Sequence, residues 1–384
     1  MDLFNVKENC CGCEACAQVC PKGIIKMEPD NEGFFYPTIQ APNECINCKA
    51  CLNVCPVKHS NEISSVFSNA YAGWALENTD VIKSSSGGFA YVAAKLFINN
   101  GGIVYGVGYS EDYYQATYYR IDSVDKLEIL RGSKYIQARK SNIYLEVKND
   151  LNDHKVLFFG TPCDCYALSR IIKDKSRLIT ISLICHGPTS SLVHRKYCES
   201  LEDEYNSKIN YFNLRWKKDD LWKPYYVYAS FNNDEHFSEK FESSDYNKAF
   251  LNFKRPSCSS CRFKKHHFSS DILIGDYHGV SSESSSYNKH GVSVILPLNN
   301  RGIDFLNEIK SDFCLQKIPL KSAIGQQAIH SPYKRKIDRL SYTDLLITNG
   351  LRIASMQKDL SHKYSCFEMI FNKVKRYIWK NLQL

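Results

Sequence analysis

The hydrophobic pattern is most regular in the segment that follows residue 88. Four apolar residues there are spaced like the buried face of a helix: Phe89, Val92, Ala93 and Leu96. Residues 99–102 read Asn-Asn-Gly-Gly and should end this helix, because both residue types tolerate positive φ angles. Residues 103–107 and 113–119 then predict two strands.

Three later apolar runs each end in small or polar residues. They are residues 156–159 before Gly160-Thr161-Pro162-Cys163, residues 178–184 before Cys185-His186-Gly187, and residues 271–274 before Gly275-Asp276. Ligands of open α/β sheets bind beyond the carboxyl ends of the strands, so we expect these three loops to share one edge of a sheet. Residues 281–286, five serines and a glutamate, are expected to form a flexible loop.

The C-terminus has a pattern of its own. An apolar stripe at helical spacing consists of Phe367, Ile370, Phe371, Val374 and Ile378, and it is flanked by Lys373, Lys375, Arg376, Trp379 and Lys380. Such a basic amphipathic helix can lie on an anionic membrane surface. The alternative is that the stripe packs on the protein itself or on a second subunit.

The most specific feature of the chain is a cysteine pattern written twice, C-x-x-C-x-x-C-x-x-x-C-P. Its first copy is Cys10, Cys13, Cys16, Cys20 and Pro21, and its second is Cys45, Cys48, Cys51, Cys55 and Pro56. This spacing is typical of two 4Fe-4S clusters, in which the fourth cysteine of each copy binds the other cluster. A disulfide framework or a pair of zinc ribbons is the alternative, but zinc sites use cysteine pairs separated by a longer loop.

The pairing rule assigns the eight thiolates to two sets. One set is Cys10, Cys13, Cys16 and Cys55, and the other is Cys45, Cys48, Cys51 and Cys20. Cys11 lies outside the repeat and is expected to be a packing residue.

Composition is consistent with a cytoplasmic protein. The 384 residues include 17 cysteines and no apolar run near the roughly 18 residues that a membrane span needs. The first residues lack the basic and apolar segments of a secretory signal, so the cysteines should be reduced thiols or metal ligands. The net charge of +8 comes from basic residues interspersed with acids, and we expect no nucleic-acid binding.

Several motifs together resemble one family. They are Ser84-Ser85-Ser86-Gly87-Gly88, Arg131-Gly132-Ser133-Lys134-Tyr135-Ile136-Gln137, Gly160-Thr161-Pro162-Cys163, residues 182–188, and Pro256-Ser257-Cys258-Ser259-Ser260-Cys261 with residues 271–276 after them. In content and order they resemble the β subunits of hydrogenases and dehydrogenases that reduce coenzyme F420, over residues 65–320. The resemblance implies FAD, one additional 4Fe-4S cluster, and electron transfer between iron-sulfur centres and a two-electron substrate. A two-cluster module is a frequent companion in that family.

The resemblance places FAD on residues that suit a pyrophosphate. Ser85, Ser86, Gly87 and Gly88 precede a predicted helix, so they offer hydroxyls, close backbone approach and the positive end of a helix dipole. Lys134 could add a charge and Tyr135 an aromatic face, and Gly160 and Thr161 complete the predicted cofactor-binding residues. The alternative for the serine-glycine segment is an ordinary loop that caps a helix.

Four of the remaining cysteines lie within the family-like motifs: Cys163, Cys185, Cys258 and Cys261. The resemblance assigns them to a third 4Fe-4S cluster. A zinc site with the same ligands, or a redox dithiol of Cys258 and Cys261 with two buried thiols, remains open. Five other cysteines are expected to be packing residues, namely Cys11, Cys165, Cys198, Cys314 and Cys366.

Candidates for acid-base chemistry are few. His186 follows a predicted ligand, and its imidazole could donate a proton or hydrogen-bond a flavin edge. Asp276, His278 and the pair His266 and His267 carry less signal. Residues 264–267 read Lys-Lys-His-His and are expected to be a solvated basic loop, although such a loop could dock an acidic ferredoxin.

The sequence therefore predicts an α+β protein with three parts. They are a ferredoxin-like two-cluster module at residues 1–60, an α/β domain for FAD and iron-sulfur at 61–330, and a basic helical extension at 331–384. The main functional hypothesis is an oxidoreductase that passes electrons from ferredoxin or another one-electron donor to FAD and a small organic, sugar-linked substrate.

Two further functional hypotheses differ in class. In one, the chain is an electron-transfer β subunit of a hydrogenase-type or dehydrogenase-type complex, with coenzyme F420 as its acceptor. In the other, it is a cluster-containing structural or nucleic-acid-binding protein without flavin. An oligomer and peripheral contact with the inner membrane through the C-terminal helix are compatible with the sequence.

Overall fold

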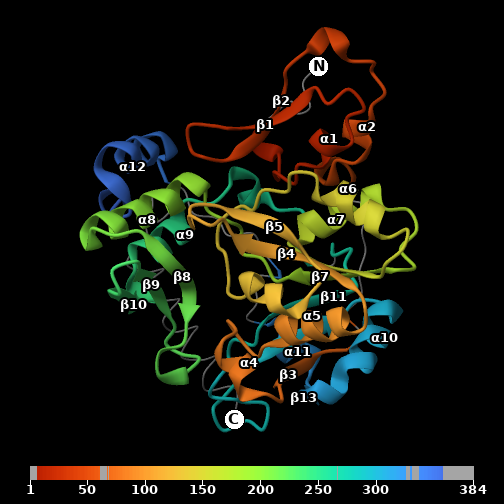
Figure 1. Ribbon diagram of the computed structural model, residues 1–384, viewed down its shortest axis with the longest axis vertical. Coiled ribbons are helices and arrows are strands. Elements are labelled where there is room, and N and C mark those ends of the chain that lie inside the picture. The colour runs from red at the N-terminus through yellow and green to blue at the C-terminus, as the bar shows by residue number, and fades with distance from the viewer. Residues whose placement is uncertain are drawn as a thin grey trace, which may run out of the picture.

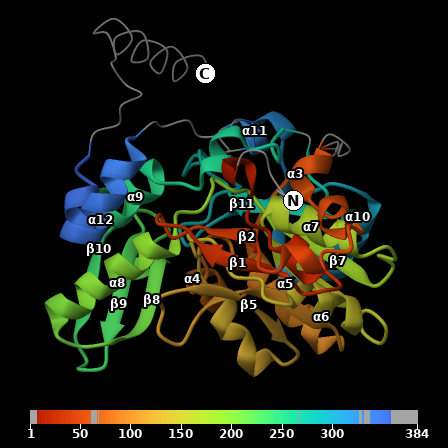
Figure 2. The ribbon, with the colours of Figure 1, turned by 90° about the horizontal axis from the view of Figure 1, so that it is seen from above.

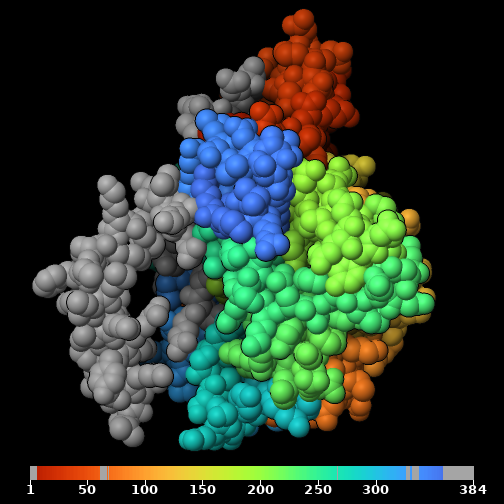
Figure 3. Space-filling model, turned by 90° about the vertical axis from the view of Figure 1, so that its left-hand side faces the viewer, coloured from red at the N-terminus to blue at the C-terminus, as the bar shows by residue number. Residues whose placement is uncertain are grey.

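The computed structural model describes residues 7–60, 67, 69–265, 267–325, 329–330 and 337–357. A small N-terminal module stands at one end of a larger body (Figures 1 and 3). The body combines a wide sheet with a second, narrow sheet that lies beside it (Figure 2). The protein is thus a mixed α/β structure with a small cysteine-rich module at its N-terminus.

The N-terminal module follows the cysteine repeat. Its elements are α1 (Ala15–Gln18), β1 (Ile25–Pro29), β2 (Phe35–Ile39), α2 (Ala50–Asn53) and α3 (Pro56–His59). The antiparallel pair β1 and β2 separates the two copies, and each copy ends in a short helix. The residues that precede α1 and α2, Glu14 and Lys49, both adopt left-handed conformations, with φ of 63° and 59°. The two cysteine loops therefore turn in the same way.

The main sheet has eight strands in the order β13-β3-β12-β11-β7-β6-β4-β5. The strands are β3 (Tyr71–Ala75), β4 (Ile103–Tyr109), β5 (Ala116–Ile121), β6 (Val156–Gly160), β7 (Leu178–Leu183), β11 (Ile272–Asp276), β12 (Ser293–Pro297) and β13 (Phe313–Lys317). Strands β4, β6, β7 and β11 are parallel neighbours, whereas the outer strands pair antiparallel. The carboxyl ends of β6, β7 and β11 consequently meet at one edge, which confirms the predicted shared edge.

Helices cover both faces of this sheet because its parallel strands are apolar on both sides. In β4, Ile103 and Tyr105 face the core beneath α6 (Ile143–Asp150) and α7 (Pro162–Ile171), whereas Val104 faces the core beneath α5 (Phe89–Asn99) and α10 (Asn300–Ile309). The predicted helix after residue 88 is confirmed as α5. The second predicted strand begins later than expected, at Ala116, because the chain turns through Tyr113 at a positive φ of 58°.

The narrow sheet was not foreseen. It consists of β8 (Ile209–Trp216), β9 (Tyr226–Phe231) and β10 (His236–Lys240), and it packs with α8 (Ser191–Tyr205), α9 (Asp245–Asn252) and α12 (Arg339–Ala354). The three strands, with α8 and α9, lie between β7 and β11 in the sequence, whereas α12 comes after the main sheet (Figure 1). The remaining short helices are α4 (Asn78–Ile82) and α11 (Leu320–Ile324).

The other expectations fall on particular segments. Residues 281–286 lie outside helices and strands, and Ser286 donates a hydrogen bond to Gln316 (2.7 Å). Lys58 and His59 end helix α3. The predicted amphipathic stripe at 367–378 and Cys366 lie outside the described residues. No helix in the described part is long and apolar enough to cross a bilayer.

Candidate metal and cofactor site

The first predicted cysteine set gathers around one cavity of the N-terminal module. The cavity is lined by Cys10, Cys13, Cys16 and Cys55, together with Cys11, Glu14, Met27, Cys51, Leu52 and Lys58. Burial raises the pKa of Cys16 and of Cys55, and the charge of Cys10 raises both further. Cys55, from the second copy of the repeat, thus joins three cysteines of the first copy, which fits the pairing predicted for a cubane.

The second set lies next to the first, and Cys51 also lines the first cavity. Cys20, Cys45 and Cys51 pack against Ile24 and Ile25. Cys48 is exposed, and its charge acts on Cys51 together with that of Cys20. Cys51 also acts on Cys16 of the first set, so the two sets are adjacent. The assignment of ligands to two clusters stays a prediction, and the arrangement of the thiols supports it.

The third set assembles where β6, β7 and the loop before β11 converge. Cys163 opens α7, Cys185 follows β7, and Cys258 lies in the 3-10 helix η7 (Pro256–Ser260) three residues before Cys261. Burial raises the pKa of Cys258, and the charges of Cys185, Cys261 and Cys163 raise it further. For Cys261, burial and then the charge of Cys163 raise the pKa to about 12. Cysteines from three segments that are far apart in sequence therefore lie near one another.

The loops that carry Cys10 and Cys185 share one hydrogen bond, in which a glycine amide donates to the sulfur two residues earlier. The Gly12 amide donates to Cys10 Sγ (3.4 Å), and the Gly187 amide donates to Cys185 Sγ (3.3 Å). Both glycines have positive φ angles, 68° and 92°. A Cβ at Gly187 would lie 3.1 Å from Cys258 Sγ, and one at Gly12 would lie 2.8 Å from the Arg255 guanidinium carbon. These amides are positioned to stabilise thiolates, as around iron-sulfur clusters.

In the described part of the chain, no three cysteine, histidine, aspartate or glutamate side chains lie close enough to bind one metal ion. A 4Fe-4S cubane distributes its four thiolates over four iron atoms, so its ligands stand farther apart than those of a single zinc ion.

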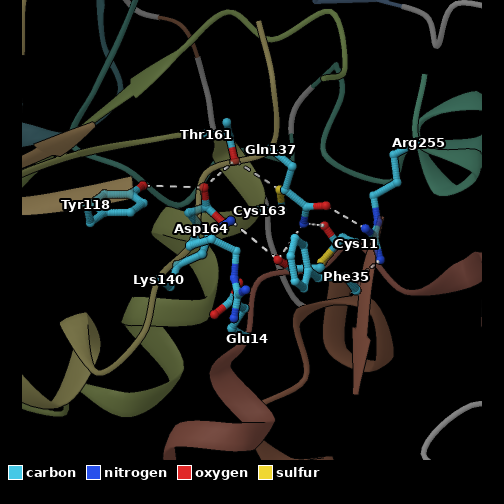
Figure 4. A network of polar contacts seen from close by, with 12 residues as sticks. Cys11, Glu14, Phe35, Tyr118, Gln137, Lys140, Thr161, Cys163, Asp164 and Arg255 are labelled. Carbon is cyan, nitrogen blue, oxygen red and sulfur yellow. Dashed lines mark hydrogen bonds and ion pairs between the residues drawn. The ribbon is translucent and has the colours of Figure 1, made fainter. Parts of the chain in front are cut away.

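A buried polar network joins the N-terminal module to the body (Figure 4). The Arg255 guanidinium donates to Cys10 O (2.7 Å), Gln137 Oε1 (2.6 Å) and Phe35 O (3.0 Å). Gln137 Nε2 donates to Gly12 O (2.7 Å), and Lys140 donates to the same oxygen (3.3 Å). The backbone of the first cysteine loop is therefore held by side chains of the body.

The same network reaches the third cysteine set. Lys140 pairs with Asp164 (3.2 Å), which accepts a hydrogen bond from Thr161 (2.9 Å). Thr161 Oγ1 also lies 3.0 Å from Cys163 Sγ. The Cys11 side chain interacts with both Cys13 and Cys163, so this cysteine stands between the first and third sets. The sequence marked Cys11 only as a packing residue.

The predicted cofactor loop is tightly packed at the start of α5. Gly87 N donates to Ser293 Oγ (3.1 Å), Ser86 Oγ contacts the same oxygen (3.0 Å), and Ser133 donates to Ser85 (3.0 Å). A Cβ at Gly87 would collide with the Gly73 carbonyl and lie 2.8 Å from the Ser293 amide nitrogen. Gly87 is thus required for the close packing of this loop.

Two cations that the sequence analysis missed hold this loop. Arg215 Nη2 donates to Ser85 O (3.2 Å), and the ammonium of Lys217 donates to Ser86 O (2.9 Å), Val81 O (2.7 Å) and the His290 carbonyl. Both side chains come from the end of β8 and are nearly buried. Their spacing of two residues, with Trp216 between them, is a strand-type signal that could have been recognised.

A polar cluster extends from this loop toward Cys185. Arg215 pairs with Asp276 at the end of β11 (2.5 Å), and His278 lies 3.4 Å from the same carboxylate. The Trp222 ring stacks on His278 at 6.3 Å. Arg215 Nε and Trp222 Nε1 are buried donors without a hydrogen-bond partner among the described residues. This cluster therefore offers free donors to a polar ligand.

The other predicted cofactor residues are divided between two places. Tyr135 stacks on Phe250 (4.5 Å), and its hydroxyl accepts a hydrogen bond from Arg215 (3.0 Å), which places it near the loop. Lys134 donates to the carbonyls of Leu130 (3.0 Å) and Arg131 (2.6 Å), and burial lowers its pKa to about 7. By contrast, Gly160 and Thr161 lie beside Cys163, and the binding roles of all these residues remain predictions.

His186 lies between the third cysteine set and the polar cluster, and this residue is exposed to solvent. Partial desolvation by its neighbours lowers the pKa of the imidazole to about 4, and the charges of Lys254 and Lys264 lower it further. The imidazole is therefore neutral at pH 7. Lys264 itself is buried and donates to Cys185 O (2.6 Å), so the expectation that it belongs to a solvated loop is wrong. His266 lies outside the described residues.

With this geometry in view, the chain was compared with known proteins. Residues 153–322 match the family model for the C-terminal region of the beta subunit of coenzyme F420 hydrogenase/dehydrogenase. This region is similar to that family. Residues 9–59 match the model of a 4Fe-4S dicluster domain. The predicted family and its N-terminal two-cluster module are confirmed. The family-like motifs at 84–88 and 131–137 lie before the first residue of the match and are not covered by it.

Among solved structures, the chain resembles part of the F420-reducing NiFe hydrogenase complex from Methanosarcina barkeri. The identity is 14%, the alignment covers 67% of this chain and 84% of that chain, and the TM-score is 0.47. The search of curated proteins gave no match. The two matches support a redox protein of the hydrogenase/dehydrogenase β-subunit type with a 4Fe-4S dicluster domain.

Proposed function

We propose that this β-subunit-type protein transfers electrons between a one-electron protein partner, such as ferredoxin, and a two-electron acceptor bound next to FAD. The observation that carries the proposal is that the residues suited to bind clusters and flavin follow one another through the protein without a gap. The three cysteine sets adjoin one another, and the third is followed through His186 by the polar cluster and the serine-glycine loop. When bound, iron-sulfur clusters supply single-electron exchange and a flavin supplies one-electron or two-electron exchange.

The cysteines of the three sets suit the binding of iron-sulfur clusters. A hydrogen bond with Cys11 and burial raise the pKa of Cys163, and burial raises that of Cys55, so without metal these thiols hold their protons at neutral pH. Metal ligation requires thiolates, and binding therefore releases protons from these sites. The amides of Gly12 and Gly187 already donate to sulfur in each loop and would keep the ligands oriented.

The serine-glycine loop and the polar cluster fit a flavin dinucleotide. The loop stands at the N-terminus of α5, an 11-residue helix, where backbone amides and the helix dipole favour a phosphate. Arg215 adds a buried positive charge beside Ser85, and its Nε is free to donate. Lys217 holds the backbone of the loop in place through three carbonyls.

Of the two enzymatic hypotheses from the sequence, the comparisons support the electron-transfer β subunit better than a separate reductase of a sugar-linked substrate. Exposed Cys48 suits such a subunit, because an external partner can approach the second cysteine set directly. Reduction of coenzyme F420 is the acceptor reaction that we propose to test first, with a small organic substrate as the second candidate.

The composition of anaerobically purified protein tests this proposal. We expect about 12 iron and 12 sulfide atoms per chain, from three cubanes of four irons each. We also expect about one FAD, identified by chromatography of the flavin released on denaturation. Zinc in place of four irons, or a preparation without flavin, would contradict the corresponding part of the proposal.

Replacing Gly87 with alanine should remove the flavin and leave the iron. The new Cβ would collide with the Gly73 carbonyl, so the loop must shift away from its present packing. We expect flavin occupancy to fall about tenfold or more at an unchanged iron content. Gly101→Asn is the matched control, because Asn tolerates the positive φ of 77° and nothing lies within 4 Å of a Cβ there. Equal flavin content in both variants would argue against binding at this loop.

A further inference from the structure

We propose that Arg255 is a positioning residue that holds the first cysteine set against the third and favours the reduced state of both clusters. The inference rests on the proposed function, since it concerns the groups that these cysteines would bind. It adds the order of the three sets and one residue that tunes two of them. Arg255 acts on cysteines of the first and third sets, and the second set, with Cys48, serves as an internal reference.

Arg255 contacts the backbone of both cysteine sets at once. Its side chain is 1% exposed and donates to Cys10 O at 2.7 Å. Its backbone amide donates to Pro188 O (3.0 Å), three residues after Cys185, and its carbonyl accepts from Cys258 N (2.9 Å). One residue thus connects the Cys10 loop to the Cys185 and Cys258 loops.

The Arg255 guanidinium bonds to neutral oxygens rather than to a carboxylate. Its three side-chain hydrogen bonds go to two backbone carbonyls and to the neutral amide of Gln137. The thiols whose charges act on the guanidinium are Cys10, Cys11 and Cys258. Each cluster gains one negative charge on reduction, so a buried cation beside both sets stabilises both reduced states.

Two other cations at this junction, Lys140 and Arg170, differ from Arg255. Lys140 is also buried near Cys163, but its charge is paired with Asp164 (3.2 Å). Arg170 donates to Asn53 O (2.9 Å) in the module, yet this contact is exposed to solvent. Solvent screens an exposed charge strongly, so Arg170 provides a matched control that also bonds the module.

The placement of Cys11 indicates which set adjoins the third. Cys11 follows Cys10 in the loop that Arg255 holds, and its side chain interacts with Cys13 and with Cys163. Cys51 is the residue of the second set that faces the first. The order is therefore the Cys48 set outermost, the Cys10 set in the middle, and the Cys163 set nearest the polar cluster.

The test is a redox titration of the anaerobic holoprotein, monitored by electron paramagnetic resonance. In Arg255→Gln we expect the equilibrium constant for reduction of two of the three clusters to fall about tenfold, which is about 59 mV for one electron. The cluster of the second set, which includes Cys48, should keep its midpoint. Arg255→Lys keeps the charge and should restore both midpoints to within about threefold of the unsubstituted protein.

Two further variants keep the test decisive. If Arg255→Gln loses iron, Gln137→Glu offers a second route, because it places a carboxylate against the guanidinium without removing it. It should move the same two midpoints downward. Arg170→Gln should leave all three midpoints unchanged.

The outcomes separate the inference from the proposed function. Three clusters whose midpoints do not move in Arg255→Gln and Gln137→Glu would overturn the role of Arg255 and leave the proposed function intact. A shift of one midpoint alone, or an equal shift in Arg170→Gln, would also overturn it. Unsubstituted protein with fewer than three clusters would instead refute the proposed cofactor content.

Discussion

Replacing Cys258 with alanine is expected to remove about four iron atoms per chain and to leave about eight. Cys258 faces Cys163, Cys185 and Cys261, so its loss takes one ligand from the third set only. The two sets of the N-terminal module share no residue with it. Iron and sulfide analysis of anaerobically purified protein measures the change, and the signal of one cluster should disappear from the paramagnetic resonance spectrum.

The matched control for this variant is Cys198→Ala. Cys198 is fully buried in α8, beside the His194 ring at 3.6 Å, and faces none of the three sets. Its replacement should keep all the iron and cost about 1 kcal/mol or more of stability through the lost packing. If Cys258→Ala retained the full iron content, or lost one zinc ion instead, a third cubane at this position would be refuted.

Removal of iron is expected to unfold the N-terminal module while the main sheet stays folded. The helices of the module have four residues each, and the apolar cluster beneath the second set contains only two buried residues, Ile24 and Ile25. Phe34 and Tyr36 of the module pack into the core of the body, but the part around the second set has no other apolar core among the described residues. So small a core cannot offset the entropy of ordering its chain, and metal binding supplies the missing free energy. By contrast, the strands of the main sheet are buried on both faces.

Hydrogen exchange before and after treatment with an iron chelator under oxidising conditions measures this effect. Amides of β1 and β2 should lose about 10³-fold or more of their protection, because local unfolding exposes them. Amides of β4 and β6 should keep theirs. The hypothesis would fail if β1 and β2 stayed protected in protein shown to be free of iron.

The parts of the fold that sequence predicted are those with a local signal. The apolar runs before Gly160, Cys185 and Gly275 are strands because parallel strands are buried on both faces and are therefore apolar throughout. The cysteine repeat was equally informative, since the spacing of its thiols follows from the shape of the cluster that they bind.

The parts that sequence did not predict depend on contacts between distant segments. Arg215 and Lys217 reach the serine-glycine loop from about 130 residues away, and their alternating spacing on a strand does not show which segment they contact. Lys264 lies in a basic stretch that looks solvated, but it is buried because it meets the Cys185 carbonyl. Tyr135 has its family-like neighbours, yet its ring packs on Phe250 of the unforeseen α9.

The bond between Arg255 and the Cys10 carbonyl spans 245 residues and therefore has a consequence for biogenesis. During synthesis at 5–20 residues per second, Cys55 is made roughly 10–40 s before Arg255. All eight cysteines of the repeat are thus made, and are accessible for cluster insertion, well before Arg255 is translated and can cover the Cys10 loop. Clusters of the first two sets can therefore be inserted before the part of the body that buries the Cys10 loop has been made.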